Sequence, residues 1–113
     1  MEIKVGEYVK STDGFIAKVE EIDEDFIDFD SPIIIGYDGL CSYFGRDQLH
    51  FIAKHSFNII DLIEEGDYVN GQKAVGISSG WIDTKEDVIR KDHIKTILTK
   101  EMFQNNEYRV ESN

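Results

Sequence analysis

The chain has 113 residues, and its 23 acidic and 12 basic residues give a formal net charge of −11 at pH 7. This charge disfavours binding to nucleic-acid phosphates and to anionic membrane surfaces. It favours a basic protein surface as the partner, although solvated carboxylates also serve solubility alone. Hydrophobic residues make up 41% and aromatic residues 12% of the chain, a composition that excludes a disordered protein.

The number of cysteines and the lengths of the apolar segments indicate the cellular compartment of the protein. Cys41 is the single cysteine, so no disulfide can form within the chain, and a reducing environment is favoured. The first residues show neither a basic leader nor an apolar signal segment, and no apolar window approaches the length of a membrane span. We therefore expect a cytoplasmic protein that does not bind membranes.

Two short segments that are sixty residues apart resemble each other. Residues 5–9 (VGEYV) and residues 65–69 (EGDYV) both place Gly, an acid, Tyr and Val in that order, as at the start of a strand. Asp13-Gly14 follows the first segment and Asn70-Gly71 follows the second, and both dipeptides favour the positive φ of tight hairpins. The sequence thus predicts two matched hairpins.

The similarity continues along both parts of the chain. Residues 26–28 (FID) correspond to residues 81–83 (WID), and residues 46–52 resemble residues 91–97, where a polar turn leads into a short apolar strand. We expect a mainly β protein made of two small SH3-like β-barrel halves packed together, comprising residues 1–55 and 56–113. The alternative is one irregular β-domain whose hairpins look alike because hairpins share the same chemistry.

Three further segments complete the predicted organisation. Residues 31–45 form an insertion in the first half, with a loop or bulge at residues 36–39. Between the halves, the apolar residues 59, 60, 62 and 63 predict a short helix capped by Ser56 or Asn58, or else a strand. A second helical turn near the C-terminus is predicted to begin after Thr99 as its N-cap.

Two stretches carry a resemblance to known sequences. Residues 55–71 and 97–103 resemble a pattern in small uncharacterised proteins of Firmicutes, their prophages and their phages. The resemblance implies tandem SH3-like folding and a mobile-element context, and it implies no activity and no functional residue. By size, charge and origin, the chain is also similar to the small acidic phage proteins that inhibit bacterial defence nucleases, which include anti-CRISPR proteins.

The candidate binding site is the acidic segment of residues 20–30. On an alternating strand, Phe26, Asp28 and Asp30 face one side, whereas Ile27 and Phe29 face the core. The exposed carboxylates then space negative charge somewhat as a phosphate backbone does, which suits the Lys and Arg of a nucleic-acid-binding protein. The alternative is a charged hairpin that protects a sheet edge. The candidate partner-binding residues are Glu20, Glu21, Asp23, Glu24, Asp25, Phe26, Asp28 and Asp30.

The sequence carries no signature of catalysis or of a cofactor. Cys41 lies between apolar and aromatic neighbours and is expected to be a buried structural thiol. The histidines lack the spacing of metal ligands, and a calcium loop counted from Asp23 would place Asp28 and Ile34 where Gly and Glu are needed. No Gly-rich phosphate loop is present. We therefore expect no catalytic residue, no bound metal and no cofactor.

These observations lead to three functional hypotheses. The first is a non-catalytic protein-binding module, in the form of a phage-encoded inhibitor whose acidic surface occupies the basic groove of a host defence nuclease. In that case the protein binds no nucleic acid directly, since its basic residues are too scattered to form a stripe. The alternative is a structural or assembly protein of a phage or mobile element. The third hypothesis is a small metal-dependent enzyme.

Overall fold

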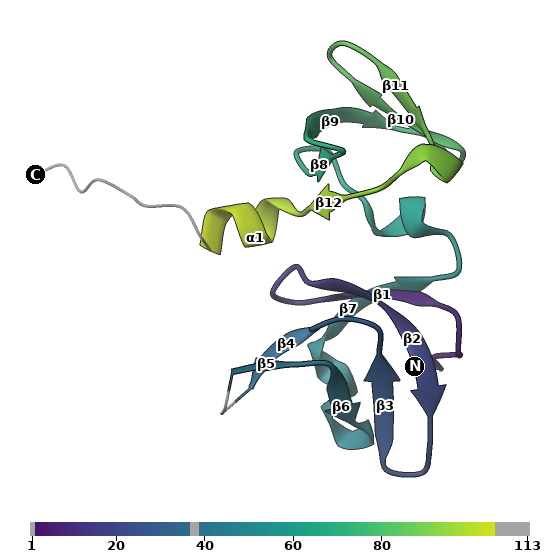
Figure 1. Ribbon diagram of the computed structural model, residues 1–113, viewed down its shortest axis with the longest axis vertical. Helices are drawn as coiled ribbons and strands as arrows, with labels where there is room; N and C mark the ends of the chain where they lie inside the picture. Colours follow the sequence, from purple (N-terminus) through teal and green to yellow (C-terminus); the bar gives the residue numbers. More distant parts are fainter. Residues whose placement is uncertain (1, 37–38, 106–113) are drawn as a thin grey trace, which may run out of the picture.

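A computed structural model of the chain describes residues 2–36 and 39–105, and most of its elements are β-strands (Figure 1). The first five-stranded sheet has the order β6-β3-β2-β1-β7, and every neighbouring pair is antiparallel. Its strands are β1 (Tyr8–Ser11), β2 (Ile16–Ile22), β3 (Phe26–Phe29), β6 (Tyr43–Gly45) and β7 (Ile52–Ser56).

The second five-stranded sheet repeats this arrangement with the order β11-β10-β9-β8-β12. Its strands are β8 (Tyr68–Val69), β9 (Gln72–Ile77), β10 (Trp81–Thr84), β11 (Val88–Arg90) and β12 (Ile97–Leu98). In both sheets a 3-10 helix joins the fourth strand to the fifth, namely η1 (Arg46–Phe51) and η3 (Lys91–His93). The predicted repeat is therefore present as two sheets of the same strand order.

Both sheets are open, whereas the sequence predicted closed barrels. Within the described residues no backbone pairing joins β6 to β7 or β11 to β12, which are the edge strands. Three of these four edge strands have only two or three residues. Closing a sheet into a barrel requires a ladder of backbone hydrogen bonds between its two edge strands, and neither sheet forms one among its described residues.

The matched segments adopt the same turn. Gly6 and Gly66 have φ angles of 93° and 97°, a region that favours glycine. The acid that follows each glycine accepts a hydrogen bond from the backbone N–H three residues before it, and the pairs are Lys4 to Glu7 (2.7 Å) and Glu64 to Asp67 (2.8 Å). Gly14, Asn70 and Gly71 also have positive φ, so the predicted hairpin turns are confirmed.

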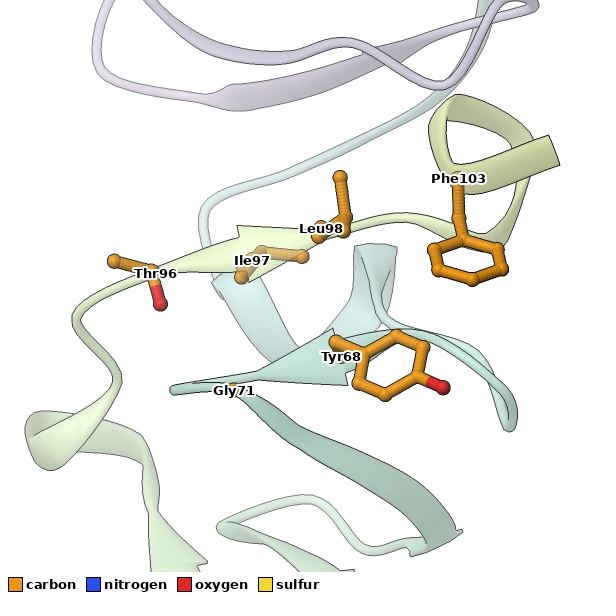
Figure 2. A pocket seen from close by; sticks show the side chains of 6 residues that line it. All are labelled: Tyr68, Gly71, Thr96, Ile97, Leu98 and Phe103. Carbon is orange, nitrogen blue, oxygen red and sulfur yellow. The ribbon is translucent and has the colours of Figure 1, made fainter. Parts of the chain in front are cut away.

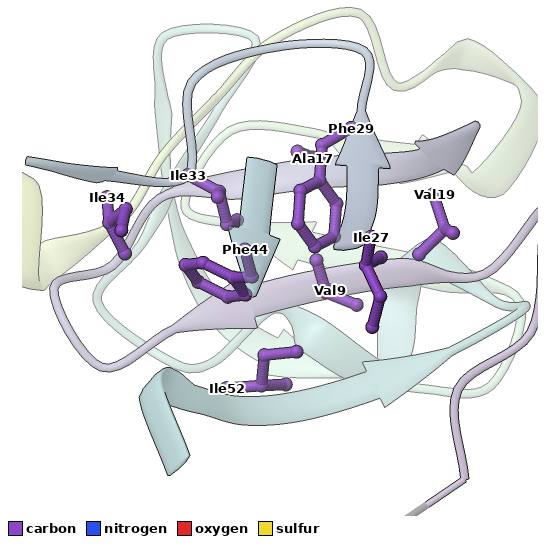
Figure 3. Close-up of a cluster of buried hydrophobic side chains, with 9 residues drawn as sticks. All are labelled: Val9, Ala17, Val19, Ile27, Phe29, Ile33, Ile34, Phe44 and Ile52. Atoms are coloured by element: carbon purple, nitrogen blue, oxygen red, sulfur yellow. The ribbon is translucent and has the colours of Figure 1, made fainter. Parts of the chain in front are cut away.

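Each half has its own apolar core. Figure 3 shows the first core, in which the rings of Phe29 and Phe44 meet edge to face at 5.3 Å. Its buried side chains are Val9, Ala17, Val19, Ile27, Phe29, Ile33, Ile34, Phe44 and Ile52. The second core is smaller and contains Ile60, Ile63, Val69, Ala74, Ile82 and Ile89. The alternation predicted for residues 26–29 is confirmed, because Ile27 and Phe29 are buried and Phe26 is exposed.

Two short helices lie where the sequence predicted them. Between the sheets, η2 (Ile59–Leu62) begins after Asn58, whose side chain accepts a hydrogen bond from the Ile60 N–H. Near the C-terminus, α1 (Lys100–Asn105) follows Thr99, whose hydroxyl accepts a hydrogen bond from the Met102 N–H. Both predicted N-caps are therefore confirmed. None of the helices in residues 2–36 and 39–105 combines the length and the apolar character needed to cross a membrane.

The insertion of the first half forms a small hairpin of its own. Its strands β4 (Ile34–Gly36) and β5 (Gly39–Cys41) pair only with each other among the described residues. The middle of the loop expected at residues 36–39, residues 37 and 38, lies outside the described residues. One side of the hairpin packs on the first core, and the other exposes Ile35 and Leu40. Cys41 packs against the core but is half-buried, so the expected full burial is wrong.

Candidate functional site

Three strands of the first sheet place acidic and aromatic side chains on one outer surface. Glu21 of β2 lies opposite Asp28 of β3, and Asp28 lies opposite Tyr43 of β6. Phe26 shares this side with Asp28, because residues two apart on a strand face the same way. We call these four residues, Glu21, Phe26, Asp28 and Tyr43, the acidic aromatic face.

The two rings of this face form an exposed pair. Phe26 and Tyr43 meet edge to face with their centroids 5.8 Å apart, and their side chains remain 45% and 51% exposed. Large aromatic side chains that stay in solvent lose the free energy that burial would provide. Aromatic residues are also enriched among the side chains that contribute most to protein–protein binding. The pair thus has the chemistry of an interface anchor.

The two carboxylates of the face form an unfavourable pair. Like charges directly opposite each other on antiparallel strands are destabilising, and Glu21 and Asp28 occupy such positions. A register shift between Val19 and Glu21 produces this pairing. A cation placed between the carboxylates would relieve the repulsion, and no described residue supplies one within ion-pair distance.

Two of the predicted binding residues stabilise the hairpin itself. The Asp23 carboxylate accepts hydrogen bonds from the N–H groups of Phe26 (2.7 Å) and Asp25 (2.8 Å), which hold the pKa of Asp23 below its usual value. The Asp30 carboxylate accepts a hydrogen bond of 2.9 Å from the Lys18 N–H beside the register shift. Both carboxylates thus have local structural partners.

The other predicted carboxylates are free to meet a partner. Within the part of the chain that the structure describes, none of them makes a side-chain hydrogen bond or ion pair. Two of them, Glu24 and Asp25, lie in the turn between β2 and β3, and the others lie on the strands. The free set is Glu20, Glu21, Glu24, Asp25 and Asp28. The structure thus divides the predicted site into structural and available carboxylates.

The histidines and the other acids do not converge. Among residues 2–36 and 39–105, no group of three or more His, Cys, Asp or Glu side chains is placed to hold a metal ion. His55 contacts the buried Glu7 at 3.0 Å. Burial would raise the pKa of Glu7, but the hydrogen bonds from His55 and the Lys4 N–H, together with nearby charges, keep that pKa below its usual value.

A buried charge cluster joins the two halves, and the sequence analysis missed it. Lys10 of β1 is 3% exposed, and its Nζ lies 3.2 Å from both Glu64 and Glu101. Lys54 and Lys100 approach Glu64 at 3.6 Å and 3.5 Å. No local sequence signal marks Lys10, since its partners are 54 and 91 residues away.

The charges of this cluster shift the pKa values of its members. Burial would lower the pKa of Lys10, but the carboxylates of Asp67, Glu101 and Glu64 raise it above its usual value. Burial would likewise raise the pKa of Glu64, but the hydrogen bond from Lys10 and the surrounding lysine charges bring it below its usual value. Both shifts favour the charged forms, so Lys10 and Glu64 stay ionised over a wider pH range than free side chains do.

An apolar cleft on the second half was also missed. Figure 2 shows it between β8, β12 and α1, with a volume of about 420 Å³. Tyr68 and Phe103 lie on one side with their ring centroids 5.6 Å apart, and Leu98 lines the cleft beside them. The packing of α1 beside β8 and β12 creates this cleft, so no local sequence motif predicts it.

Comparison of the chain with protein-family models, with curated proteins and with solved structures gave no match.

Proposed function

We propose that this chain is a non-catalytic protein-binding module whose acidic aromatic face docks on a basic protein surface. The observation that carries the proposal is the pairing of Glu21 with Asp28 beside the exposed rings of Phe26 and Tyr43. A Lys or Arg from the partner would neutralise the two opposed carboxylates, while the rings would provide the apolar contact area. The net charge of −11 adds a long-range attraction to such a partner.

The proposal also extends to the fold of each half. We infer that each half is an SH3-like unit. The shared strand order, the 3-10 helix before the fifth strand and the matched glycine turns support this inference. We further propose a role in a bacterial cytoplasm, which is what the resemblance of residues 55–71 to phage and prophage sequences would imply. An inhibitor that covers the nucleic-acid groove of a defence nuclease is the specific form of the proposal.

The first test identifies the partner and then measures its affinity. The protein is used as bait in lysate of a bacterial host that carries defence nucleases, at low and high salt, and the captured protein is purified. We expect a basic nuclease or nucleoprotein that is released at high salt, because salt screens exposed charges. Capture that does not depend on salt, or capture of an acidic protein, would contradict the proposal.

Matched variants then locate the contact. Neutralising the opposed pair with Glu21→Gln and Asp28→Asn should weaken binding at least tenfold, which corresponds to about 1.4 kcal/mol. The control, Glu65→Gln with Glu86→Gln, removes the same charge from exposed positions of the second half and should change affinity less than threefold. Equal losses in the two double variants would show that only net charge matters and that no face is recognised.

A second candidate, an assembly protein of a phage or mobile element, is favoured by a different observation. Ile35 and Leu40 lie opposite each other on the β4–β5 hairpin and are 67% and 61% exposed. Such a pair could bury against another assembly subunit. Light scattering distinguishes the two candidates, because self-association that persists at high salt and is lost in Leu40→Ser would favour assembly.

A further inference from the structure

A second hollow lies between the two halves, away from the face described above. It has a volume of about 480 Å³. Its lining residues are Tyr8 and Ile16 of the first sheet, Ile59 of η2, and Lys91, Asp92, Ile94, Lys95 and Ile97. Junctions between two structural units are common places for small-molecule sites. We call this hollow the inter-half cleft.

Apolar side chains form one part of the lining of the cleft, and the rest of the lining is polar. Four half-buried isoleucines line it, together with the ring of Tyr8, and they come from both halves and from the connector. These isoleucines are Ile16, Ile59, Ile94 and Ile97. The apolar part of the lining favours the body of a ligand that is itself apolar or flat.

The rim of the cleft is cationic, although the protein is strongly acidic. Lys91 and Lys95 are exposed, and neither makes an ion pair among the described residues. The ammonium of Lys18 lies 5.6 Å from the centre of the Tyr8 ring, which itself lines the cleft. The single acid in the lining is Asp92. By contrast, Lys10, Lys54 and Lys100 all pair with Glu64.

The backbone that carries the two rim lysines is held in place. The Lys91 N–H donates to the Gly80 carbonyl at 3.0 Å, and the Lys95 N–H donates to the Asn70 side chain at 2.7 Å. The amide of Asn70 also donates to the His93 carbonyl at 2.9 Å. Fixed backbone positions reduce the entropy that a ligand must overcome to bring both lysines to one anionic group.

We propose that the inter-half cleft binds a small organic phosphate with a ring body, which is the chemistry of a nucleotide. The phosphate meets Lys91 and Lys95 at the rim, and the ring packs against Tyr8 and the isoleucines. Asp92 accepts hydrogen bonds from sugar hydroxyls, as carboxylates do in other nucleotide sites. The cleft shares no residue with the acidic aromatic face, so this proposal does not depend on the proposed protein partner.

Calorimetric titration of the wild-type protein with the four nucleoside 5′-monophosphates tests the proposal, with the free nucleosides and inorganic phosphate as separate probes. We expect at least one monophosphate to bind at least tenfold more tightly than its nucleoside and than phosphate alone. Amide chemical shifts should then move at Tyr8 and at residues 91–97. Binding of none of the four monophosphates, or equal affinity for nucleotide and inorganic phosphate, would overturn it.

Two double variants distinguish specific binding in the inter-half cleft from nonspecific attraction to positive charge. Lys91→Gln with Lys95→Gln should lower the affinity for the monophosphate at least tenfold. The control, Lys73→Gln with Lys85→Gln, removes the same charge around another hollow of the second half, which lacks the isoleucines and Tyr8. It should retain the affinity within threefold, and equal losses in both variants would overturn the proposal. Circular dichroism melts check that both variants are folded.

Discussion

The two halves of the molecule share a scaffold and differ in what they add to it. Both begin with the same glycine turn, run through the same strand order and carry a 3-10 helix before the last strand. On the third strand, Phe26 in one half and Trp81 in the other are both exposed, while the following Ile27 and Ile82 are both buried. A repeated strand pattern can therefore hold a core constant while the outer surface changes.

The outer surfaces differ in charge. In the first half Phe26 lies next to Tyr43 and two opposed carboxylates, whereas in the second half Trp81 lies opposite Arg90. The cores differ as well, because the insertion adds Ile33 and Ile34 to the first core. The second core instead includes Ile60, which lies in η2, and Ile63, which follows η2 directly. The second half thus depends on the connector for part of its apolar burial.

The largest effect on the free energy of unfolding should come from truncating a buried side chain in either core. Phe44→Ala should lower the free energy of unfolding by about 3–5 kcal/mol, and Ile82→Ala by about 2–5 kcal/mol, because both side chains are fully buried. Urea unfolding followed by circular dichroism measures both values. A loss below about 1 kcal/mol in one half alone would show that this half is loosely packed and that the comparison between the cores fails.

The next effect concerns the charge cluster that joins the halves. Lys10→Met should cost about 2 kcal/mol, because it removes charge-assisted hydrogen bonds to Glu64 and Glu101. The control, Lys54→Met, removes a lysine that is 42% exposed and should cost less than about 1 kcal/mol. Equal losses of stability for Lys10→Met and Lys54→Met in thermal melts would show that the burial of Lys10 adds nothing to the contact between the halves.

The same cluster should give the protein a pH window. The pKa of Glu64 is lowered in the folded chain, so its contribution is present above the unfolded value of about 4.3 and is lost as pH falls through the folded pKa. The pKa of Lys10 is raised, so its contribution is complete below about 10.4 and is lost as pH rises through the folded pKa. Melting temperatures between pH 3 and pH 11 should fall at both ends, and less steeply in Lys10→Met.

A smaller effect tests whether the two glycine turns are equivalent. Gly6→Ala and Gly66→Ala should each cost about 1–3 kcal/mol, because both residues have φ near 95°. Gly80→Ala is the control, since this glycine has no positive φ and its added methyl would meet open space. Urea unfolding should give similar costs for the first two variants, and clearly unequal values would contradict the repeat at this position.

The smallest effect concerns Thr99, which lies between β12 and α1. Its hydroxyl donates to the Gly14 carbonyl of the first half at 2.8 Å and caps α1. Thr99→Ala should cost about 1 kcal/mol, whereas Thr99→Ser keeps the hydroxyl and should cost less. Thermal melts of the two variants measure this difference in stability. Equal melting temperatures would mean that the methyl group of Thr99, and not its hydroxyl, stabilises the contact between the halves.

The sequence by itself determined the local features of this protein. Asp13-Gly14 and Asn70-Gly71 predicted both hairpin turns, and the alternation of residues 26–29 predicted which side chains are buried. Thr99 predicted the start of one helix, and the start of the other was narrowed to Ser56 or Asn58, of which Asn58 is the cap. It also located the acidic segment, but it could not tell that Asp23 and Asp30 bond to the hairpin backbone. That distinction depends on the register between β2 and β3.

Only the tertiary structure decided how distant parts of the chain meet. The Lys10 cluster, the apolar cleft beside α1 and the inter-half cleft combine residues that lie up to 91 positions apart. Local propensity acts over a few residues, so it carries no information about such contacts. Whether the sheets close also depends on how their edge strands meet in space, and a sequence pattern does not define that meeting.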